Sequence, residues 1–260
     1  MIARRLLAEH RIRLPLILLA VAAFGFALVG VFAATDDATR ASSVSGNAAI
    51  AFRLLGLDPL AAWVSLGQIH PIFLVLSALY AVSLGVRSVA GELEAGTLEL
   101  TLARPLSRSR YLGTHLLLLV PGCLLIALAY AGGTLLGDRV FDAPGAPLVP
   151  GRLLLAALQS GLLLLAVGVL AVLVSALASE RGRALSWVLG ITIGMYAANF
   201  LLVLWEPTRD LARLTFFWYF SPGRTIQNGS VPWGDVAVLA GWSIAASGAA
   251  VAHFRRRDLV

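Results

Sequence analysis

Six long apolar stretches, separated by shorter polar segments, dominate the pattern of hydrophobic and polar positions along this chain. A bilayer core about 30 Å thick needs roughly 20 apolar residues in a helix, and each stretch reaches that length. The chain is therefore predicted to be an all-α membrane protein that forms a single domain over residues 1–260. The expected transmembrane helices are residues 14–34, 67–87, 113–137, 153–178, 184–205 and 234–254.

The beginning of the chain could be mistaken for a secretory signal. Its apolar run of about 21 residues is too long for a typical signal-peptide core, so we expect a retained first helix. Residues 1–13 have an amphipathic pattern, with arginines opposite apolar side chains. Such a segment can lie in the headgroup plane as an interface helix, or it can simply orient the first span, and both roles are compatible.

The composition supports a membrane protein and excludes one kind of enzyme. The chain is 59% hydrophobic and 13% charged, whereas soluble domains carry about 25% charged residues. All 20 basic residues are arginine. A phosphate-binding loop of the Walker A type requires a lysine, so this chain is not expected to hydrolyse ATP by itself.

The arginines also predict an orientation. With the N-terminus inside, thirteen arginines lie in the inner segments and seven in the outer ones. Because cytoplasmic segments are enriched in Lys and Arg, we expect both termini in the cytoplasm. This distribution explains the high isoelectric point, so no nucleic-acid partner is expected.

The middle of each predicted span contains no charged residue. Ion-coupled transporters keep ionisable groups at that depth, which argues against that class. The four histidines lie near membrane boundaries, and no His or Cys residues have metal-ligand spacing. An intramembrane protease and a metal site are therefore not expected.

Neutral polar residues do occur at depth, and most are expected to form hydrogen bonds between helices. Some could instead line a path for an amphipathic substrate. The candidates for the path are Tyr80, Ser83, Tyr196 and Asn199.

The stretch between spans two and three combines charges with turn-forming residues. Gly96 is placed to end an extension of span two, and Thr97 to cap a short helix over 98–104 with its hydroxyl. Pro105 would end that helix, and Ser107 would start span three. Alternation of apolar and polar residues is also compatible with a strand, but a lone strand would have no partner.

Three leucines in this short helix, Leu98, Leu100 and Leu102, are expected to leave apolar surface exposed among charges. Such a surface is typical of a docking site, which we favour over a solvated loop. Since the chain lacks its own energy source, the docked partner would have to supply it.

The segment from Glu92 to Arg108, E-L-E-A-G-T-L-E-L-T-L-A-R-P-L-S-R, resembles the cytoplasmic segment of ABC-2 type exporter permeases. The resemblance implies an export pathway for a drug, lipid or peptide in a bacterial or archaeal cytoplasmic membrane. It implies two permease copies, or a permease and a paralogue, with two cytosolic ABC ATPase subunits that bind ATP and Mg. It also implies that 88–110 is the coupling element and that 211–229 is an outer re-entrant or interfacial element. The residues carried over by position are Glu92, Glu94, Gly96, Thr97, Glu99, Arg104, Pro105, Ser107 and Arg108.

Span five contains small residues at four-residue spacing, Gly190, Gly194 and Ala198, which permit close helix approach. They could form a contact between two permeases or pack within one chain. Two other functions remain open: a permease that serves protein maturation, as in copper delivery to nitrous-oxide reductase, and a scaffold that transports nothing.

Overall fold

The computed structural model describes residues 11–35, 58–103 and 107–257, and within these ranges the regular structure is helical. Six helices are long and apolar enough to cross a membrane. Most of residues 1–13, the predicted interface helix, lies outside the described residues. The elements are α2 (Arg13–Ala34), α5 (Pro59–Ile69), α6 (Pro71–Val86), η1 (Arg87–Gly91), α7 (Glu92–Glu94), α8 (Thr97–Leu102), α9 (Arg108–Phe141), α10 (Pro150–Leu177), α11 (Arg181–Leu204), η2 (Glu206–Leu214), η3 (Phe216–Tyr219), α12 (Pro222–Asn228) and α13 (Trp233–Arg256).

The six predicted spans are confirmed as helices, but the bounds of the second and third differ from the prediction. Span two was expected to begin at residue 67, but α6 begins at Pro71 and the preceding residues belong to α5. The break is at His70, whose backbone is extended with ψ 138°. A proline disfavours helical geometry in the residue before it, which explains the break. The third span is longer than expected, since α9 runs from Arg108 to Phe141.

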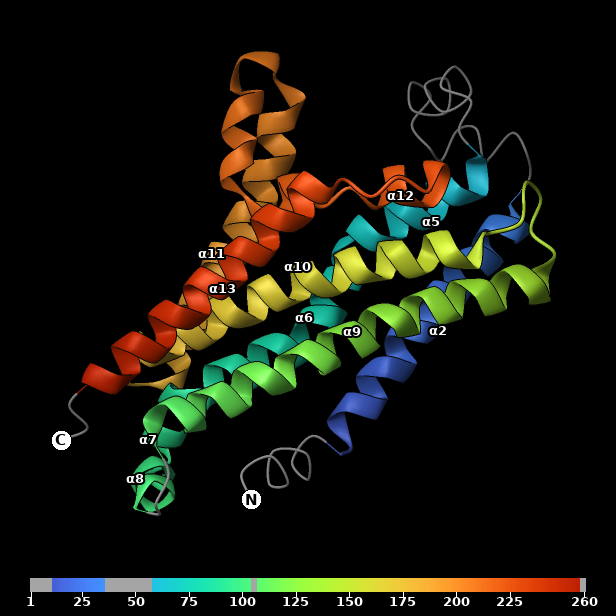
Figure 1. Ribbon diagram of the computed structural model, residues 1–260. Coiled ribbons are helices and arrows are strands. Elements are labelled where there is room, and N and C mark those ends of the chain that lie inside the picture. The colour runs from blue at the N-terminus through green and yellow to red at the C-terminus, as the bar shows by residue number, and fades with distance from the viewer. Residues whose placement is uncertain (1–10, 36–57, 104–106, 258–260) are drawn as a thin grey trace.

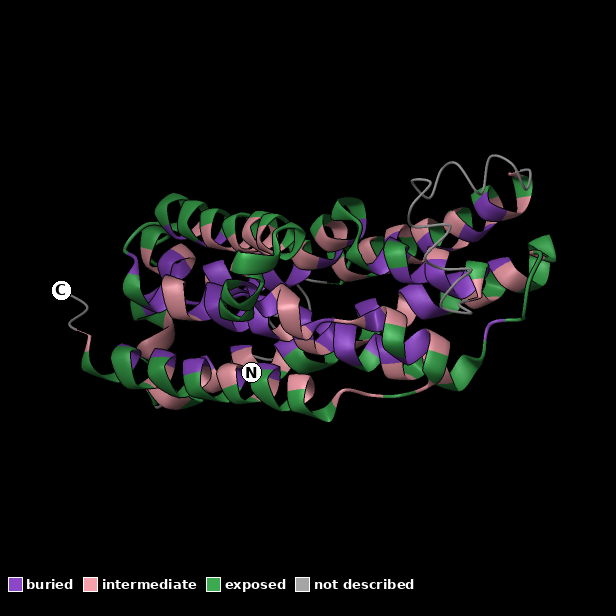
Figure 2. Ribbon diagram, turned by 90° about the horizontal axis from the view of Figure 1, so that it is seen from above, coloured by how far each residue is buried: buried purple, intermediate pink, exposed green. Residues whose placement is uncertain are grey.

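Helix α10 forms the centre of the bundle and packs against α6, α9 and α13 (Figure 1). In its most apolar window 78% of the residues are buried, against 6% in α11. Buried residues lie along the middle of the molecule and exposed ones on its outer helices (Figure 2). Thus α10 is a core helix, and α11 leaves most of its surface free within this chain.

Small residues allow the helices to approach closely. A Cβ atom added at Gly133 of α9 would lie 2.0 Å from the backbone oxygen of Ala22 in α2. At Gly85 of α6 it would lie 2.5 Å from the Cβ of Ala171 in α10. These contacts leave no room for a side chain, so glycine fixes the spacing of both helix pairs.

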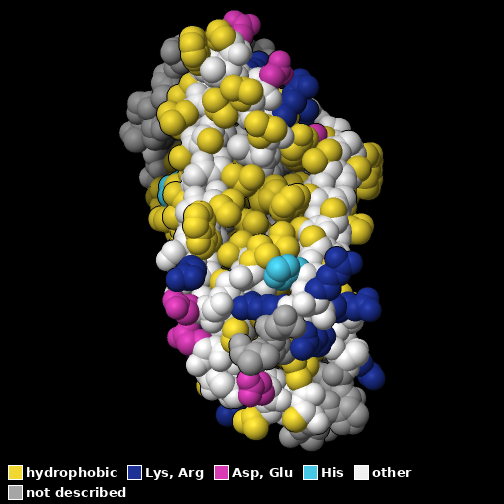
Figure 3. Space-filling model, turned by 90° about the vertical axis from the view of Figure 1, so that its left-hand side faces the viewer, with side chains coloured by type: hydrophobic (Ala, Val, Ile, Leu, Met, Phe, Trp, Pro, Cys, Tyr) yellow, Lys and Arg dark blue, Asp and Glu magenta, His cyan; other side chains and the backbone are white. Residues whose placement is uncertain are grey.

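The two ends of the bundle differ. The start of α2, the end of α13 and the α7–α8 segment lie toward one end, whereas α5 and α12 lie at the other (Figure 1). Beyond α11 the chain folds back along that helix as η2. On the face shown in Figure 3, apolar side chains cover the middle, and charged ones gather above and below them. This banding is the pattern expected of a surface in contact with lipid.

Candidate functional site

The α7–α8 segment is a short helical projection at one end of the bundle (Figure 1). Helix α6 runs through the π-helical turn η1 into α7, and α8 follows after a two-residue connection. The predicted continuation of span two beyond Arg87 is therefore confirmed, and the strand alternative is wrong for Thr97–Leu102.

Gly96 turns the chain between α7 and α8. Its φ of 64° lies in the left-handed region, which glycine adopts at little cost. Its amide donates to the Leu93 carbonyl oxygen at 3.0 Å, as expected for the residue after a helix end. The predicted role of Gly96 as a helix terminator is confirmed.

Thr97 does not cap α8 as predicted. Gly96 occupies the N-cap position, and Thr97 is the first residue of the helix. The Thr97 hydroxyl instead donates to Oε2 of Glu92 at 2.6 Å. Because Gly96 takes the N-cap position, Thr97 lies one residue inside the helix, and its hydroxyl donates a charge-assisted hydrogen bond instead of accepting from the first amides.

Glu92, which the resemblance placed in the coupling element, is buried. Its other carboxylate oxygen lies 3.3 Å from Nε of Arg87, on the preceding turn. Glu92 therefore joins η1 to α8 through Arg87 on one side and Thr97 on the other. Its interactions hold the segment together from within.

The three leucines of α8 do not form one exposed surface, which corrects that expectation. Leu98 is fully buried, and Leu102 packs partly against the same core. Leu100 is 72% exposed and has the exposed carboxylate of Glu99 beside it in the sequence. One face of α8 thus anchors the helix to the bundle, and the other presents an apolar residue next to an acid.

Two other motif residues bind neighbouring helices. An oxygen of Glu94 accepts a hydrogen bond from the Arg181 amide at 2.6 Å, at the first residue of α11. The guanidinium of Arg108 donates to carbonyl oxygens of Phe254, Arg255 and Arg257 at the end of α13. Residues of the motif are therefore bonded to the start of α11 and to the end of α13.

Of the three remaining motif residues, one has its predicted role and two lie in a part of the chain that the structure does not describe. Ser107 is the N-cap of α9, and its hydroxyl accepts from the Arg110 amide at 3.3 Å, as predicted. Arg104 and Pro105 lie outside the described residues.

The first two path candidates lie inside the chain's own packing. The Tyr80 hydroxyl donates to the Leu118 carbonyl oxygen of α9 at 2.9 Å, and the ring is buried beside Gly122. The Ser83 hydroxyl donates to the Tyr80 carbonyl oxygen within α6 at 3.0 Å. Their place on a transport path stays a prediction.

The other two path candidates connect α11 to neighbouring segments. The Tyr196 hydroxyl donates to the Ile69 carbonyl oxygen at 3.2 Å, and its ring lies edge-on to Phe217 at 5.3 Å between centroids. Oδ1 of Asn199 accepts from the Thr215 hydroxyl at 3.1 Å. Both residues hold the η2–η3 region against α11.

The small residues of α11 face outward. Gly190 and Gly194 are exposed, and a Cβ atom added to either would meet nothing within 4 Å. Ala198 is half-buried. Close packing within the chain, which the sequence left open, is therefore absent at these two glycines among the described residues.

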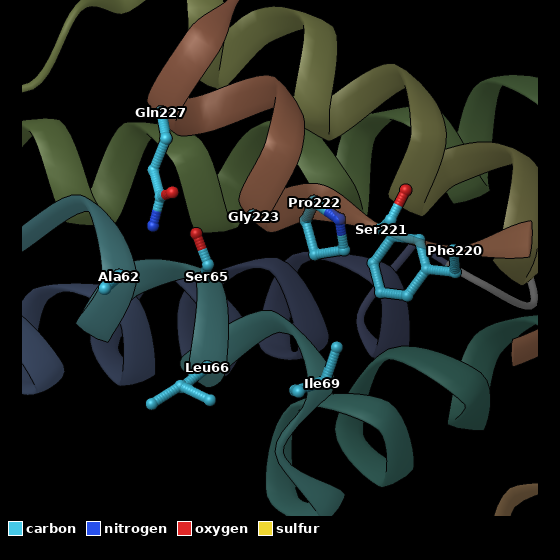
Figure 4. A pocket seen from close by; sticks show the side chains of 9 residues that line it. All are labelled: Ala62, Ser65, Leu66, Ile69, Phe220, Ser221, Pro222, Gly223 and Gln227. Carbon is cyan, nitrogen blue, oxygen red and sulfur yellow. The ribbon is translucent and has the colours of Figure 1, made fainter. Parts of the chain in front are cut away.

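A cavity of about 220 Å³ lies between α5 and the η3–α12 region (Figure 4). The side chains of α5 face Phe220–Gly223 and Gln227 across it. The nine lining residues are apolar or neutral, so the cavity suits uncharged groups. They are Ala62, Ser65, Leu66, Ile69, Phe220, Ser221, Pro222, Gly223 and Gln227.

Two residues fix the α7–α8 end of the molecule, and the sequence did not identify the partners of either. The Arg257 guanidinium donates to carbonyl oxygens of Ala176 and Ala178 at the end of α10. Ser175 binds the backbone of η1. A serine within an apolar run signalled a hydrogen bond between helices, but no pattern named its partner. In the described ranges no three His, Cys, Asp or Glu side chains are placed to hold a metal ion.

Together, six apolar helices and a helical projection at one end define a multi-pass membrane protein. The family model described as ABC-2 family transporter protein matches residues 8–259, so the chain belongs to this family. A comparison with curated proteins found no match. The chain is a permease subunit of an ABC transporter, and membership of the family implies an ABC ATPase partner.

Proposed function

We propose that this chain forms the export pathway for an amphipathic drug, lipid or peptide and that a separate cytosolic ATPase drives it. The α7–α8 segment is the coupling element that enters a groove of that ATPase. ATP and Mg are bound by the ATPase, and the permease chain carries out no catalysis. The assembly contains two permeases and two ATPases in a bacterial or archaeal cytoplasmic membrane, with both permease termini inside.

The observation that carries the proposal is the division of α8 into an anchored and a free face. Leu98 is buried in the bundle, whereas Leu100 and Glu99 are exposed. The free face therefore offers one apolar side chain and one acid to a partner protein. The short helix can therefore bind a partner without losing its attachment to the membrane helices.

The exposed face of α11 supports a contact between two permeases. Gly190 and Gly194 offer open backbone at a spacing that permits close helix approach. The neighbouring Trp187 and Ile193 are also exposed apolar residues of α11. A second permease copy or a paralogue would cover this face.

The mechanism follows from the attachment of α8. Closure of the two ATPases on ATP would displace the docked α8 helices. Because Glu92, Glu94 and Leu98 join the segment to the bundle, the displacement would pass to the membrane helices. The neutral cavity near α5 and α12 suits the apolar part of an amphipathic substrate.

The test is co-purification of the permease with a candidate ABC ATPase partner. We expect Glu99→Arg and Leu100→Glu to reduce the retained ATPase at least several-fold, because both residues belong to the free face of α8. Glu206→Arg is the matched control, since it reverses an exposed charge at the start of η2. Membrane insertion of all variants is measured by their yield in the membrane fraction.

Two results would contradict the proposal. If the wild-type permease retains no ATPase, the coupling role fails and a scaffold function becomes the alternative. If the α8 variants retain as much ATPase as Glu206→Arg, the docking face lies elsewhere.

A further inference from the structure

Ser175 of α10 lies where α6 passes into the coupling segment, and its hydroxyl forms three hydrogen bonds there. The oxygen accepts from the amides of Val89 and Ala90 at 3.1 and 2.9 Å. The hydroxyl donates to the Val86 carbonyl oxygen at 2.7 Å. Ser175 is fully buried, so these bonds do not compete with water.

The geometry of η1 explains why this hydroxyl is needed. A π-helical turn interrupts the regular hydrogen-bond pattern of an α-helix, and such turns are frequent at functional sites. Val89 and Ala90 are fully buried within the turn. Buried amides require acceptors, and the side chain of α10 supplies one oxygen to both.

Two neighbouring contacts strengthen the same junction. The Tyr111 hydroxyl of α9 donates to the Ser88 carbonyl oxygen at 2.7 Å. Two residues before η1, Gly85 packs directly against Ala171 of α10. The π-helical turn is therefore held by α9 on one side and by α10 on the other.

We propose that Ser175 is a positioning residue for energy coupling: it fixes η1 to α10, so that α8 and α10 move as one body. The inference rests on the proposed coupling role of α7–α8 and adds the route by which motion reaches the centre of the bundle. Since α10 contacts α6, α9, α11 and α13, a displacement of α8 passes directly to the core helix.

The first experiment uses the permease without its ATPase. We expect Ser175→Ala to speed hydrogen exchange about tenfold in peptides that cover residues 86–92, because two buried amides lose the hydroxyl oxygen as an acceptor. Ser175→Thr, which keeps a hydroxyl, should restore slow exchange. Ser160→Ala is the matched control, since Ser160 is also buried in α10 but bonds within its own helix, to Ala156.

The second experiment separates coupling from stability. Nitroxide labels are placed at Ala103→Cys, just after α8, and at Leu177→Cys, at the end of α10. Both positions are exposed, whereas the native Cys123 is buried. In the permease–ATPase complex, we expect ATP to leave the distance between the labels unchanged when Ser175 is present. In Ser175→Ala, ATP should shift or broaden that distance while the ATPase stays bound and active.

The results distinguish the two proposals. The positioning role is overturned if ATP changes the distance equally in the labelled permease with Ser175 and in the one with Ser175→Ala. It is also overturned if ATP changes the distance in neither. In both cases the coupling proposal stands. Exchange in Ser175→Ala that matches Ser160→Ala also overturns the positioning role. A wild-type permease that binds no ATPase overturns the proposed function, whereas the exchange result still decides whether Ser175 holds η1.

Discussion

Glu92 and Glu99 are seven residues apart in the same motif, but they face different surroundings. Glu92 is buried and holds Arg87 and Thr97, whereas Glu99 is exposed. A motif written as letters treats the two acids alike. The fold divides the motif into residues that maintain the shape of the segment and residues that are free to contact a partner.

This division predicts different effects for two threonines of α8. Thr97→Val keeps the shape of the side chain but removes a hydrogen bond to a carboxylate, so we expect a loss of about 1–3 kcal/mol in the free energy of unfolding. Thr101→Val removes a bond to the helix's own Thr97 carbonyl oxygen and should cost less. Thermal unfolding of both variants in one detergent measures the difference. Equal midpoints would show that the Glu92–Thr97 contact contributes nothing specific.

At the scale of elements, the end of α13 depends on α9. A helix leaves its last carbonyl groups without intrahelical donors, and a cation favours that end. Arg108 supplies both a positive charge and N–H donors to the carbonyl groups at the end of α13. Its guanidinium carbon also lies 6.0 Å from the centroid of the Phe254 ring. The first turn of one membrane helix thus caps the last turn of another.

We therefore expect Arg108→Ala to increase hydrogen exchange in the last turn of α13, over residues 253–257, at least several-fold. The free carbonyl groups would weaken the final turn of the helix. Arg110→Ala is the control, because it removes an exposed arginine from the same turn of α9. Similar exchange in the two variants would contradict the capping role.

At the scale of the whole molecule, the arginine distribution predicts which end faces the cytoplasm. Gly182 lies in the first turn of α11, and Pro144 lies in the connection between α9 and α10 at the other end. In intact cells, we expect a membrane-impermeant maleimide to label Pro144→Cys but not Gly182→Cys. Gly182→Cys should be labelled once the membrane is permeabilised. The buried native Cys123 should give low background. The reverse labelling pattern would show that the orientation is wrong.

The outward glycines of α11 predict a loss of association between copies. Gly190→Leu or Gly194→Leu should reduce recovery of an untagged copy with a tagged one several-fold, because the added side chains hold the helices apart. Gly241→Leu is the matched control on α13, where the glycine is also exposed with open space around it. If all three variants associate as the wild type does, α11 is not the contact.

The sequence by itself determined the membrane class, the six spans, the extension of span two and the turn at Gly96. These follow from local rules: length and apolarity set a span, and a glycine adopts the left-handed backbone that ends a helix. It also located the segment whose resemblance pointed to the family that the whole chain matches. The residues near these features could be identified because each requirement acts over a few positions in the chain.

Only the tertiary structure decided which motif residues face inward. The break at His70, the pairing of Thr97 with Glu92, the burial of Leu98 and the hold of Ser175 on η1 all differ from, or go beyond, the sequence prediction. Ser175 lies 85 residues or more from the amides that it binds, so no local pattern could name the partner. Such contacts depend on how α6 and α10 pack, and packing is a property of the whole bundle, not of any one segment.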